Sequence, residues 1–146
     1  MSANRLADLF TVAGQSPWLD NLKREYIING EFARVLASGI RGLTSNPTIF
    51  QKAIQGSALY DDQFHDSIQR GLTTEETYWE LVVSDIIGAL DIFGPLYVSS
   101  SGLDGFVSVE VSPGLAQDMD GTVAAAQELH DRIARPNVMI KVPATK

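Results

Sequence analysis

Two stretches decide the fold class of this chain: FVSVEVS at residues 106–112 and NVMIKV at residues 137–142. In both, every second residue is a valine or isoleucine, which is the pattern of a strand with one buried face. The intervening residues 120–134 carry four apolar side chains at helical spacing: Val123, Ala126, Leu129 and Ile133. Strand, helix and strand in this order form a βαβ unit, which implies parallel strands.

Two further strands are expected upstream. Residues 16–21 are an extended piece that ends in a turn or cap, and residues 40–47 are a strand that Pro47 stops. Between them, residues 29–38 have the spacing of a short helix, and Gly39 suits the left-handed position after its end. The sequence therefore predicts an α/β fold with three or four parallel strands.

Three helices are expected after Pro47. A short one covers residues 48–54, and a second runs from Ser57 to Gly71 with an apolar face at a spacing of four: Tyr60, Phe64 and Ile68. A long helix begins at Thr73, which stands at capping-box spacing from Glu76. Gly94–Pro95 is expected to break or kink that helix. Tyr78, Trp79 and Phe64 fall at helical spacing and are expected in the core.

The composition excludes several functional classes. With 11 basic and 18 acidic side chains the formal charge is −7, which opposes binding to nucleic acid. No cysteine is present, so neither a disulfide scaffold nor a thiolate metal site can form. The long helix carries five acidic residues and is therefore not expected to span a membrane: Glu75, Glu76, Glu80, Asp85 and Asp91. The N-terminus shows no secretory signal, so a cytoplasmic location is expected.

The position of the last strand, close to the C-terminus, bears on whether the predicted sheet is complete. The chain stops at Lys146, four residues after the last expected strand. A parallel strand needs a neighbour and covering helices, so we expect a truncated chain whose sheet has an exposed edge. Self-association through this unpaired edge is an expected behaviour.

Lys141 is the first candidate for chemistry. It is expected on the inward face of its strand, between Ile140 and Val142. Burial lowers the pKa of a lysine, and a neutral amine can condense with a carbonyl to form a Schiff base. The alternative is an edge-strand lysine that only blocks aggregation, and that alternative is the commoner one for a single lysine.

Three other polar residues lie at or near strand ends. Glu110 shares the inward face with Lys141 and could shuttle protons, or it could form a structural ion pair. Asn46 could hold a substrate hydroxyl, or it could turn the chain before Pro47. Asp20 could act as a general acid or base, or it could cap a helix.

No metal site is expected. His65 and His130 lie on different helices beside aspartates and have the pattern of surface residues. The segment from Asp118 to Gly121 contains a piece of a calcium loop, but a helix cap explains it better.

Four segments together resemble the transaldolase family in its longer bacterial form. They are WLDNL at residues 18–22, GLTSNPTIF at 42–50, VSVEVSP at 107–113 and MIKVPAT at 139–145. The resemblance covers residues 16–146 and leaves residues 1–15 as an N-terminal extension. The last two segments are the most specific, and the order of all four adds to the match.

The resemblance implies a fold and a reaction. The fold is a (β/α)₈ TIM barrel of the class I aldolase type, with only about its first four strands present, because a complete barrel needs about 250 residues. The family moves a dihydroxyacetone unit from a ketose phosphate, sedoheptulose 7-phosphate or fructose 6-phosphate, to an aldose phosphate in the pentose phosphate pathway. It needs no cofactor and no metal, and its partners are the sugar phosphates alone.

The resemblance also implies a role for each candidate residue. Lys141 carries the Schiff base, and Asp20 is the acid and base where the carbon–carbon bond breaks. Glu110 acts through a water during formation and hydrolysis of the Schiff base. Asn46 holds hydroxyls of the dihydroxyacetone part, and Thr44 assists it.

Later strands carry the family's phosphate-binding arginine and the threonine that orients the catalytic water. We therefore expect little or no transfer by these 146 residues alone. Two alternatives remain open. One is a Schiff-base aldolase that cleaves without transfer, and the other is a non-catalytic half-barrel that needs a partner half.

Overall fold

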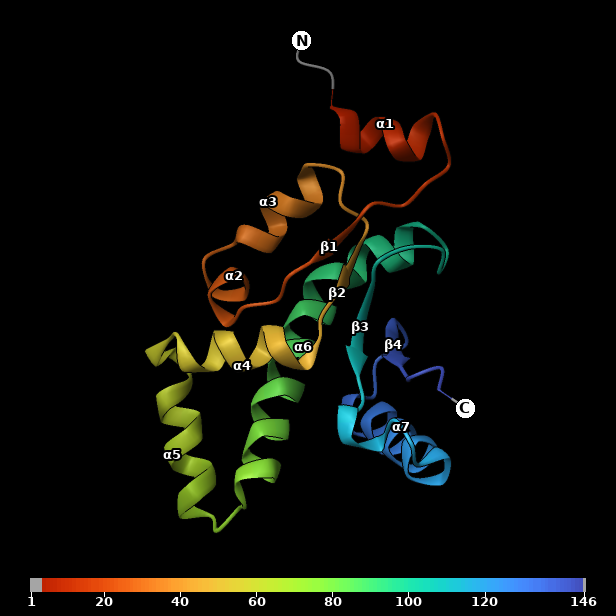
Figure 1. Cartoon of the computed structure of the whole chain (residues 1–146). Coiled ribbons are helices and arrows are strands. Elements are labelled where there is room, and N and C mark those ends of the chain that lie inside the picture. Colours follow the sequence, from red (N-terminus) through yellow and green to blue (C-terminus); the bar gives the residue numbers. More distant parts are fainter. Residues whose placement is uncertain (1–3, 146) are drawn as a thin grey trace.

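A computed structural model describes residues 4–145 of the chain (Figure 1). The strands are β1 (Trp18–Asp20), β2 (Gly42–Thr44), β3 (Phe106–Glu110) and β4 (Val138–Lys141). The helices are α1 (Arg5–Thr11), α2 (Arg24–Ile28), α3 (Glu31–Ala37), α4 (Pro47–Gln55), α5 (Asp61–Gln69), α6 (Thr74–Ser99) and α7 (Met119–Ile133). Two short 3₁₀ turns, η1 (Ala58–Tyr60) and η2 (Pro113–Leu115), complete the order.

The four strands form one parallel sheet in the order β1-β2-β3-β4, so each strand pairs with the one before it in the chain. This confirms the expected α/β class. Within the described residues the sheet is open, with β1 and β4 as its edges. The arrangement is that of part of a (β/α)₈ barrel.

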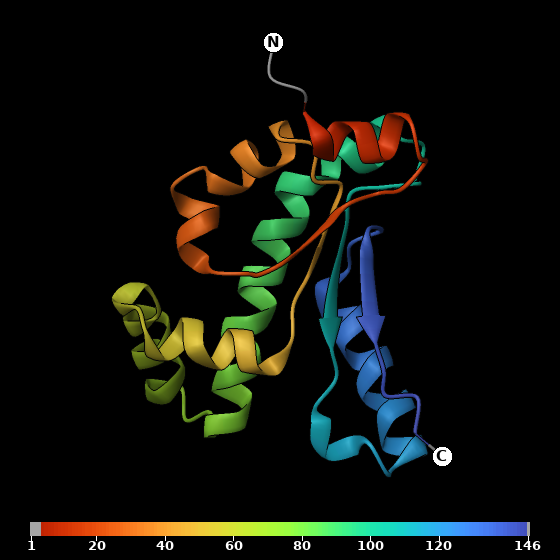
Figure 2. The ribbon, with the colours of Figure 1, turned by 45° about the horizontal axis from the view of Figure 1, so that its top comes forward.

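The apolar face of the sheet packs on helices. Leu43, Val107 and Val109 are fully buried and join one core with residues of α6. In both views α6 runs along β3, and α7 lies against β4 (Figure 1, Figure 2). Because side chains alternate along a strand, the polar set falls on the opposite, uncovered face. That face carries Asp20, Thr44, Glu110 and Lys141.

Helix α6 is the central element of the core. Its start is fixed by the expected capping box, in which Thr73 Oγ1 accepts from the Glu76 backbone N–H and the Glu76 carboxylate accepts from the Thr73 N–H. It continues through Pro95 to Ser99, so the expected break does not occur. By length and composition alone α6 could cross a membrane, with a mean hydropathy of 1.7 over its most apolar window. In this structure its apolar face is buried against β3 and the neighbouring helices.

A buried ionic network that sequence reasoning missed joins α2, η1 and α6. Arg24 Nε donates to Asp85 Oδ1 at 2.7 Å, and the Tyr60 hydroxyl donates to Asp85 Oδ2 at 2.7 Å. The Arg24 guanidinium also stacks 4.2 Å above the Tyr60 ring. Burial and the adjacent Asp85 carboxylate raise the pKa of the Tyr60 phenol, so it remains a proton donor across neutral pH. Asp85 is 1% exposed.

Some predicted details of the helices are wrong. Phe64 and Ile68 are 40% and 47% exposed, because α5 turns Ser67 and Gln63 toward α6 instead. Val123 on α7 is also exposed. Helix α1 was not expected, and a helix near α2 was expected only in the alternative in which Asp20 is a cap. α1 packs close to the turn at Gly39, where an added Cβ would lie 2.7 Å from the Ala7 nitrogen.

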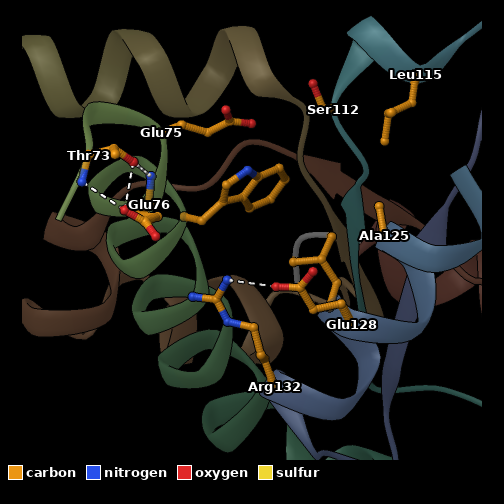
Figure 3. A pocket seen from close by; sticks show the side chains of 10 residues that line it. Thr73, Glu75, Glu76, Ser112, Leu115, Ala125, Glu128 and Arg132 are labelled. Carbon is orange, nitrogen blue, oxygen red and sulfur yellow. Dashed lines mark hydrogen bonds and ion pairs between the residues drawn. The ribbon is translucent and has the colours of Figure 1, made fainter. Parts of the chain in front are cut away.

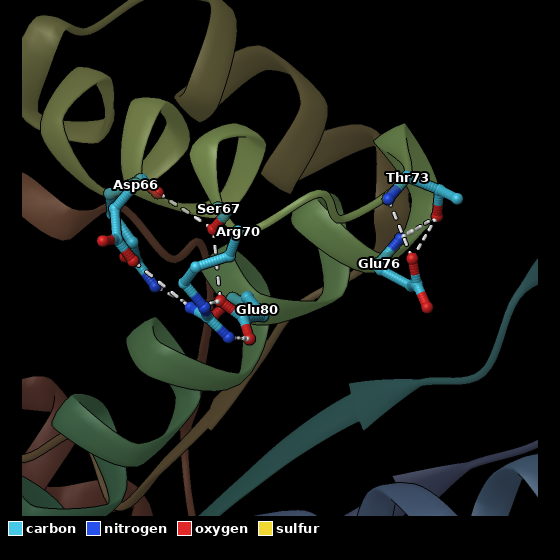
Figure 4. Close-up of polar contacts among 7 residues, drawn as sticks. Asp66, Ser67, Arg70, Thr73, Glu76 and Glu80 are labelled. Atoms are coloured by element: carbon cyan, nitrogen blue, oxygen red, sulfur yellow. Dashed lines mark hydrogen bonds and ion pairs between the residues drawn. The ribbon is translucent and has the colours of Figure 1, made fainter.

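Polar contacts between α5 and α6 give the chain a pH-dependent contribution to stability (Figure 4). Arg70 donates to both carboxylate oxygens of Glu80, at 2.9 and 2.8 Å, and Ser67 donates to the same carboxylate. The hydrogen bonds from Arg70 hold the pKa of Glu80 below its ordinary value. A lowered pKa in the folded state stabilises the fold above the unfolded value, and this contribution is lost as the pH falls through the folded value.

We therefore expect Glu80→Gln to lower the melting temperature at neutral pH. The difference from wild type should shrink as the pH falls through the lowered folded-state pKa of Glu80, because protonation removes the charge that Arg70 stabilises. Thermal melts at several pH values measure this. Glu75→Gln, an exposed carboxylate on the same helix, is the matched control and should show a smaller difference at neutral pH. A difference for Glu80→Gln that does not shrink as the pH is lowered would contradict the prediction.

Candidate active site

Five polar residues predicted from the sequence line one hollow on the uncovered face of the sheet. Asp20, Thr44, Asn46, Glu110 and Lys141 surround it, together with the first residues of α4 and Pro113. Its volume is about 760 Å³. The hollow lies at the carboxyl ends of the strands, which is where barrels and open α/β sheets carry their active sites.

The strand register explains why these side chains meet. Asp20, Thr44 and Ser108 are Cα partners across β1, β2 and β3. Two residues after Ser108, Glu110 on β3 is the Cα partner of Lys141 on β4. Partners in adjacent strands lie about 4.8 Å apart and point to the same face. The hollow therefore has two neighbouring rows of polar side chains.

Lys141 and Glu110 form an ion pair, with 3.5 Å between Lys141 Nζ and Glu110 Oε1. Each side chain is 37% exposed. Lys141 was expected to be buried on the inward face of its strand, and that part of the prediction is wrong in this structure. The reason is that β4 is an edge strand whose polar face is uncovered within the described residues. The pairing of amine and carboxylate itself is as expected.

Asn46 has a structural task as well as a place in the hollow. It is the N-cap of α4, and its Oδ1 accepts a hydrogen bond of 3.0 Å from the Ile49 N–H. Pro47 follows at the first helical position, as expected for a residue with no N–H to donate. Because the cap fixes the side-chain oxygen, the two N–H bonds of the amide remain as donors.

Asp20 ends β1 and lies exposed at the side of the hollow. The alternative that Asp20 caps a helix is wrong, because Lys23 occupies the N-cap position of α2. Its carboxylate is therefore available to the hollow.

Sequence reasoning missed Ser108 and Ser45. The Ser108 hydroxyl donates to Thr44 Oγ1 at 3.0 Å, and the Ser45 hydroxyl donates to the Ser108 carbonyl at 2.9 Å. Both serines are buried. A signal for Ser108 was present, because it shares the inward face of its strand with Glu110.

A second hollow, of about 420 Å³, lies between the start of α6 and α7 (Figure 3). Its lining includes Trp79, Glu128 and Arg132, and Arg132 Nη1 stands 3.7 Å from Glu128 Oε1. Thr73 and Glu76 also line it, and the capping box already uses their polar groups. None of the five predicted residues lies there.

Neither histidine lines the hollow, and the Asp118 segment caps a helix. Within residues 4–145 no group of three His, Cys, Asp or Glu side chains is placed to hold a metal ion. His65 and His130 are exposed, as predicted. Asp118 Oδ1 accepts from the Gly121 N–H at 2.9 Å and so caps α7, which confirms the cap in place of a calcium loop.

The segments that build the hollow match one family of known proteins. The family described as Transaldolase/Fructose-6-phosphate aldolase matches over residues 17–146. The chain belongs to this family. The resemblance seen in the four motifs is thereby confirmed.

Several curated relatives are similar to the chain. A transaldolase of Neisseria gonorrhoeae is 48% identical over 132 residues, which cover 90% of this chain. A transaldolase of Trichodesmium erythraeum is 44% identical over 146 residues, and one of Parafrankia is 45% identical over 142. The aligned region spans 38% of the length of each of these relatives. The roles of Lys141, Asp20, Glu110, Asn46 and Thr44 stay predictions.

Proposed function

We propose that the protein to which these residues belong is a transaldolase that works through a Schiff base on Lys141. Its substrates are a ketose phosphate, sedoheptulose 7-phosphate or fructose 6-phosphate, and an aldose phosphate, as in the pentose phosphate pathway. The observation that carries the proposal is the placement of Lys141 Nζ 3.5 Å from a Glu110 oxygen, in the hollow that Asp20 and Asn46 also line. The membership of the family supports it.

In the proposed mechanism Lys141 forms the covalent intermediate, and Glu110 and Asp20 transfer the protons. The Lys141 amine adds to the ketose carbonyl, and loss of water gives a protonated imine. Glu110 transfers the protons of this step through a water molecule. Asp20 then takes the proton of the hydroxyl next to the breaking carbon–carbon bond, and an aldehyde leaves. The bonding electrons remain as an enamine on Lys141, which attacks the acceptor aldehyde while Asp20 returns the proton.

We further propose that these 146 residues alone transfer little or nothing. Within residues 4–145, Lys141 is the only cation that lines the hollow, and the proposed chemistry occupies it. A phosphate dianion would meet two carboxylates there, Asp20 and Glu110, with no guanidinium to bind it. Without phosphate binding the reacting carbons are not held in place.

Borohydride trapping tests both proposals. The chain, and a version extended to eight strands, are incubated with fructose 6-phosphate, reduced and mapped by peptide mass spectrometry. We expect a three-carbon adduct on Lys141 of the extended version and little on the shorter chain. If Lys141 stays unlabelled in both, the Schiff-base proposal fails. Robust transfer by the 146 residues would refute the second proposal alone.

Two simple measurements test the alternatives, which are cleavage without transfer and a half-barrel that needs a partner half. The family description also names an aldolase, so cleavage of fructose 6-phosphate without an acceptor aldehyde would favour an enzyme that does not transfer. The open β4 edge favours self-association of the 146-residue chain, which would appear as folding that depends on protein concentration. A cytoplasmic location remains part of the proposal.

Asn46 allows its cap and its binding role to be separated. Asn46→Asp keeps a good N-cap oxygen but replaces the amide donors with a carboxylate, so we expect stability within about 0.5 kcal/mol of wild type. Transfer by the extended version should fall at least about tenfold, because a donor to a substrate hydroxyl is lost. Asn46→Ala removes both functions and should also cost about 1 kcal/mol of stability. Urea denaturation and steady-state kinetics measure the two effects. Full activity in Asn46→Asp would overturn the binding role.

A further inference from the structure

Ser108 is a buried hydroxyl whose contact the proposed mechanism does not use. It lies on β3, two residues before Glu110, and is 3% exposed. Its hydroxyl donates to Thr44 Oγ1 on β2 at 3.0 Å. Its carbonyl accepts from the Ser45 hydroxyl at 2.9 Å. The Ser108 side chain therefore bonds to Thr44, while the bond from Ser45 goes to the Ser108 backbone only.

The next question is which of the two hydroxyl groups, Ser108 or Thr44, donates in this hydrogen bond. In a contact between two hydroxyl groups either oxygen can be the donor. We assign Ser108 as the donor, because its buried hydroxyl contacts only Thr44 within residues 4–145, whereas Thr44 lines the hollow and can donate to a bound molecule. The Thr44 oxygen accepts that bond and keeps its own proton, which has no acceptor within residues 4–145. Thr44 lines the hollow. Its proton is thus left to point away from Ser108, toward the open side of the sheet.

The register decides what lies on that side. Thr44 is the Cα partner of Ser108 on one side and of Asp20 on the other. Asp20 and Thr44 therefore stand next to each other on the same face, about 4.8 Å apart at the backbone. A substrate oxygen that lies between these two side chains can bond to both the Asp20 carboxylate and the Thr44 hydroxyl.

We propose that Ser108 is a positioning residue that fixes Thr44 as a hydrogen-bond donor to the substrate oxygen that Asp20 deprotonates. This inference rests on the proposed function. When the carbon–carbon bond breaks, that oxygen passes its proton to Asp20 and carries negative charge before it becomes the aldehyde oxygen. A donor held ready at this point stabilises the developing charge. Without Ser108, the hydrogen bond that holds Thr44 Oγ1 is lost, so the Thr44 side chain can change its rotamer and its O–H is no longer prepositioned.

The test is a double-mutant cycle in the version extended to eight strands, with Ser108→Ala, Thr44→Val and the double variant. We expect Ser108→Ala to lower kcat about tenfold, with a smaller change in KM, because one oriented hydrogen bond is worth that factor. In the Thr44→Val background the same change should have less than about a twofold effect, because the group that Ser108 orients is gone. Ser108→Thr, which keeps the hydroxyl, should restore most of the rate.

Ser45→Ala is the matched control. Ser45 is fully buried and also loses one hydrogen bond between β2 and β3, but its hydroxyl contacts a backbone carbonyl and not Thr44. Ser45→Ala should therefore destabilise the fold about as much as Ser108→Ala while leaving kcat within about twofold. Equal losses of kcat in both alanine variants, or a Ser108→Ala effect that is the same with and without Thr44, would overturn the inference.

Two readouts separate this inference from the proposed function. Borohydride trapping on Lys141 should persist in Ser108→Ala. If wild type itself gives no adduct, the Schiff base is refuted and the role of Ser108 is not. The Thr44 rotamer, measured by three-bond couplings in the 146-residue chain, needs no activity. We expect one rotamer in wild type and an average in Ser108→Ala. A single rotamer in both would overturn the positioning role whatever the activity.

Discussion

Lys141→Arg should abolish transfer by the eight-stranded version and leave its fold intact. Arginine keeps the positive charge, so it preserves the ion pair with Glu110 that wild type makes at 3.5 Å. A guanidinium stays protonated and cannot add to a carbonyl, so no imine can form. We expect kcat to fall by at least about 10⁴-fold, as when other enzymes lose their nucleophile. Steady-state kinetics with fructose 6-phosphate and an acceptor aldehyde measure this.

Lys52→Arg is the control for a lysine outside the hollow. Lys52 is exposed on α4 and does not line the hollow, so its replacement should leave kcat within about twofold. Circular dichroism should show the same helix content in wild type and in both variants. An active Lys141→Arg variant would show that another residue is the nucleophile or that the reaction does not proceed through a Schiff base.

Asp85→Ala should be among the most destabilising single substitutions in the chain. It removes the carboxylate that accepts from both Arg24 and Tyr60, and it leaves a largely buried guanidinium without its counter-ion. Breaking a buried pair by removing one partner costs about 3–5 kcal/mol. The attachment of α2 and η1 to α6 should weaken together. Urea denaturation followed by circular dichroism measures the free energy of unfolding.

Asp91→Ala is the matched control on the same helix. Asp91 also pairs with an arginine, Arg135, at 2.9 Å, but its side chain is 58% exposed, so the loss should stay within about 1 kcal/mol. The double variant Arg24→Met with Asp85→Leu should recover much of the loss, because it leaves no unpaired buried charge. Equal losses in Asp85→Ala and Asp91→Ala would contradict the assigned role of the network.

The sequence alone was sufficient to predict the features that depend on residues close together in the chain. Alternation in β3 and β4 with a helix between them predicts parallel strands, and it places Glu110 and Lys141 next to each other. The capping box at Thr73 and the cap at Asp118 depend on residues three apart, so they can be read without the fold. For the same reason the start of α6 was predicted well.

Features that depend on distant partners were not predictable. Arg24 and Asp85 are 61 residues apart, and no local pattern tells a buried pair from two surface charges. Phe64 lies on an apolar stripe, yet polar contacts of Ser67 with Glu80 and of Gln63 with the Glu80 carbonyl decide which face of α5 meets α6. The exposure of Lys141 depends on what covers β4, which periodicity does not report.

The order of the sheet has a consequence for synthesis on the ribosome. Strand order in space equals strand order in the chain, so each strand after β1 finds its partner already made when it emerges. No early strand has to wait for, or make room for, a later one between it and its neighbour. The nascent chain can therefore add one strand and its helix at a time, and each addition buries the edge that the previous one exposed. The most recent edge is the surface that a chaperone would need to shield during elongation.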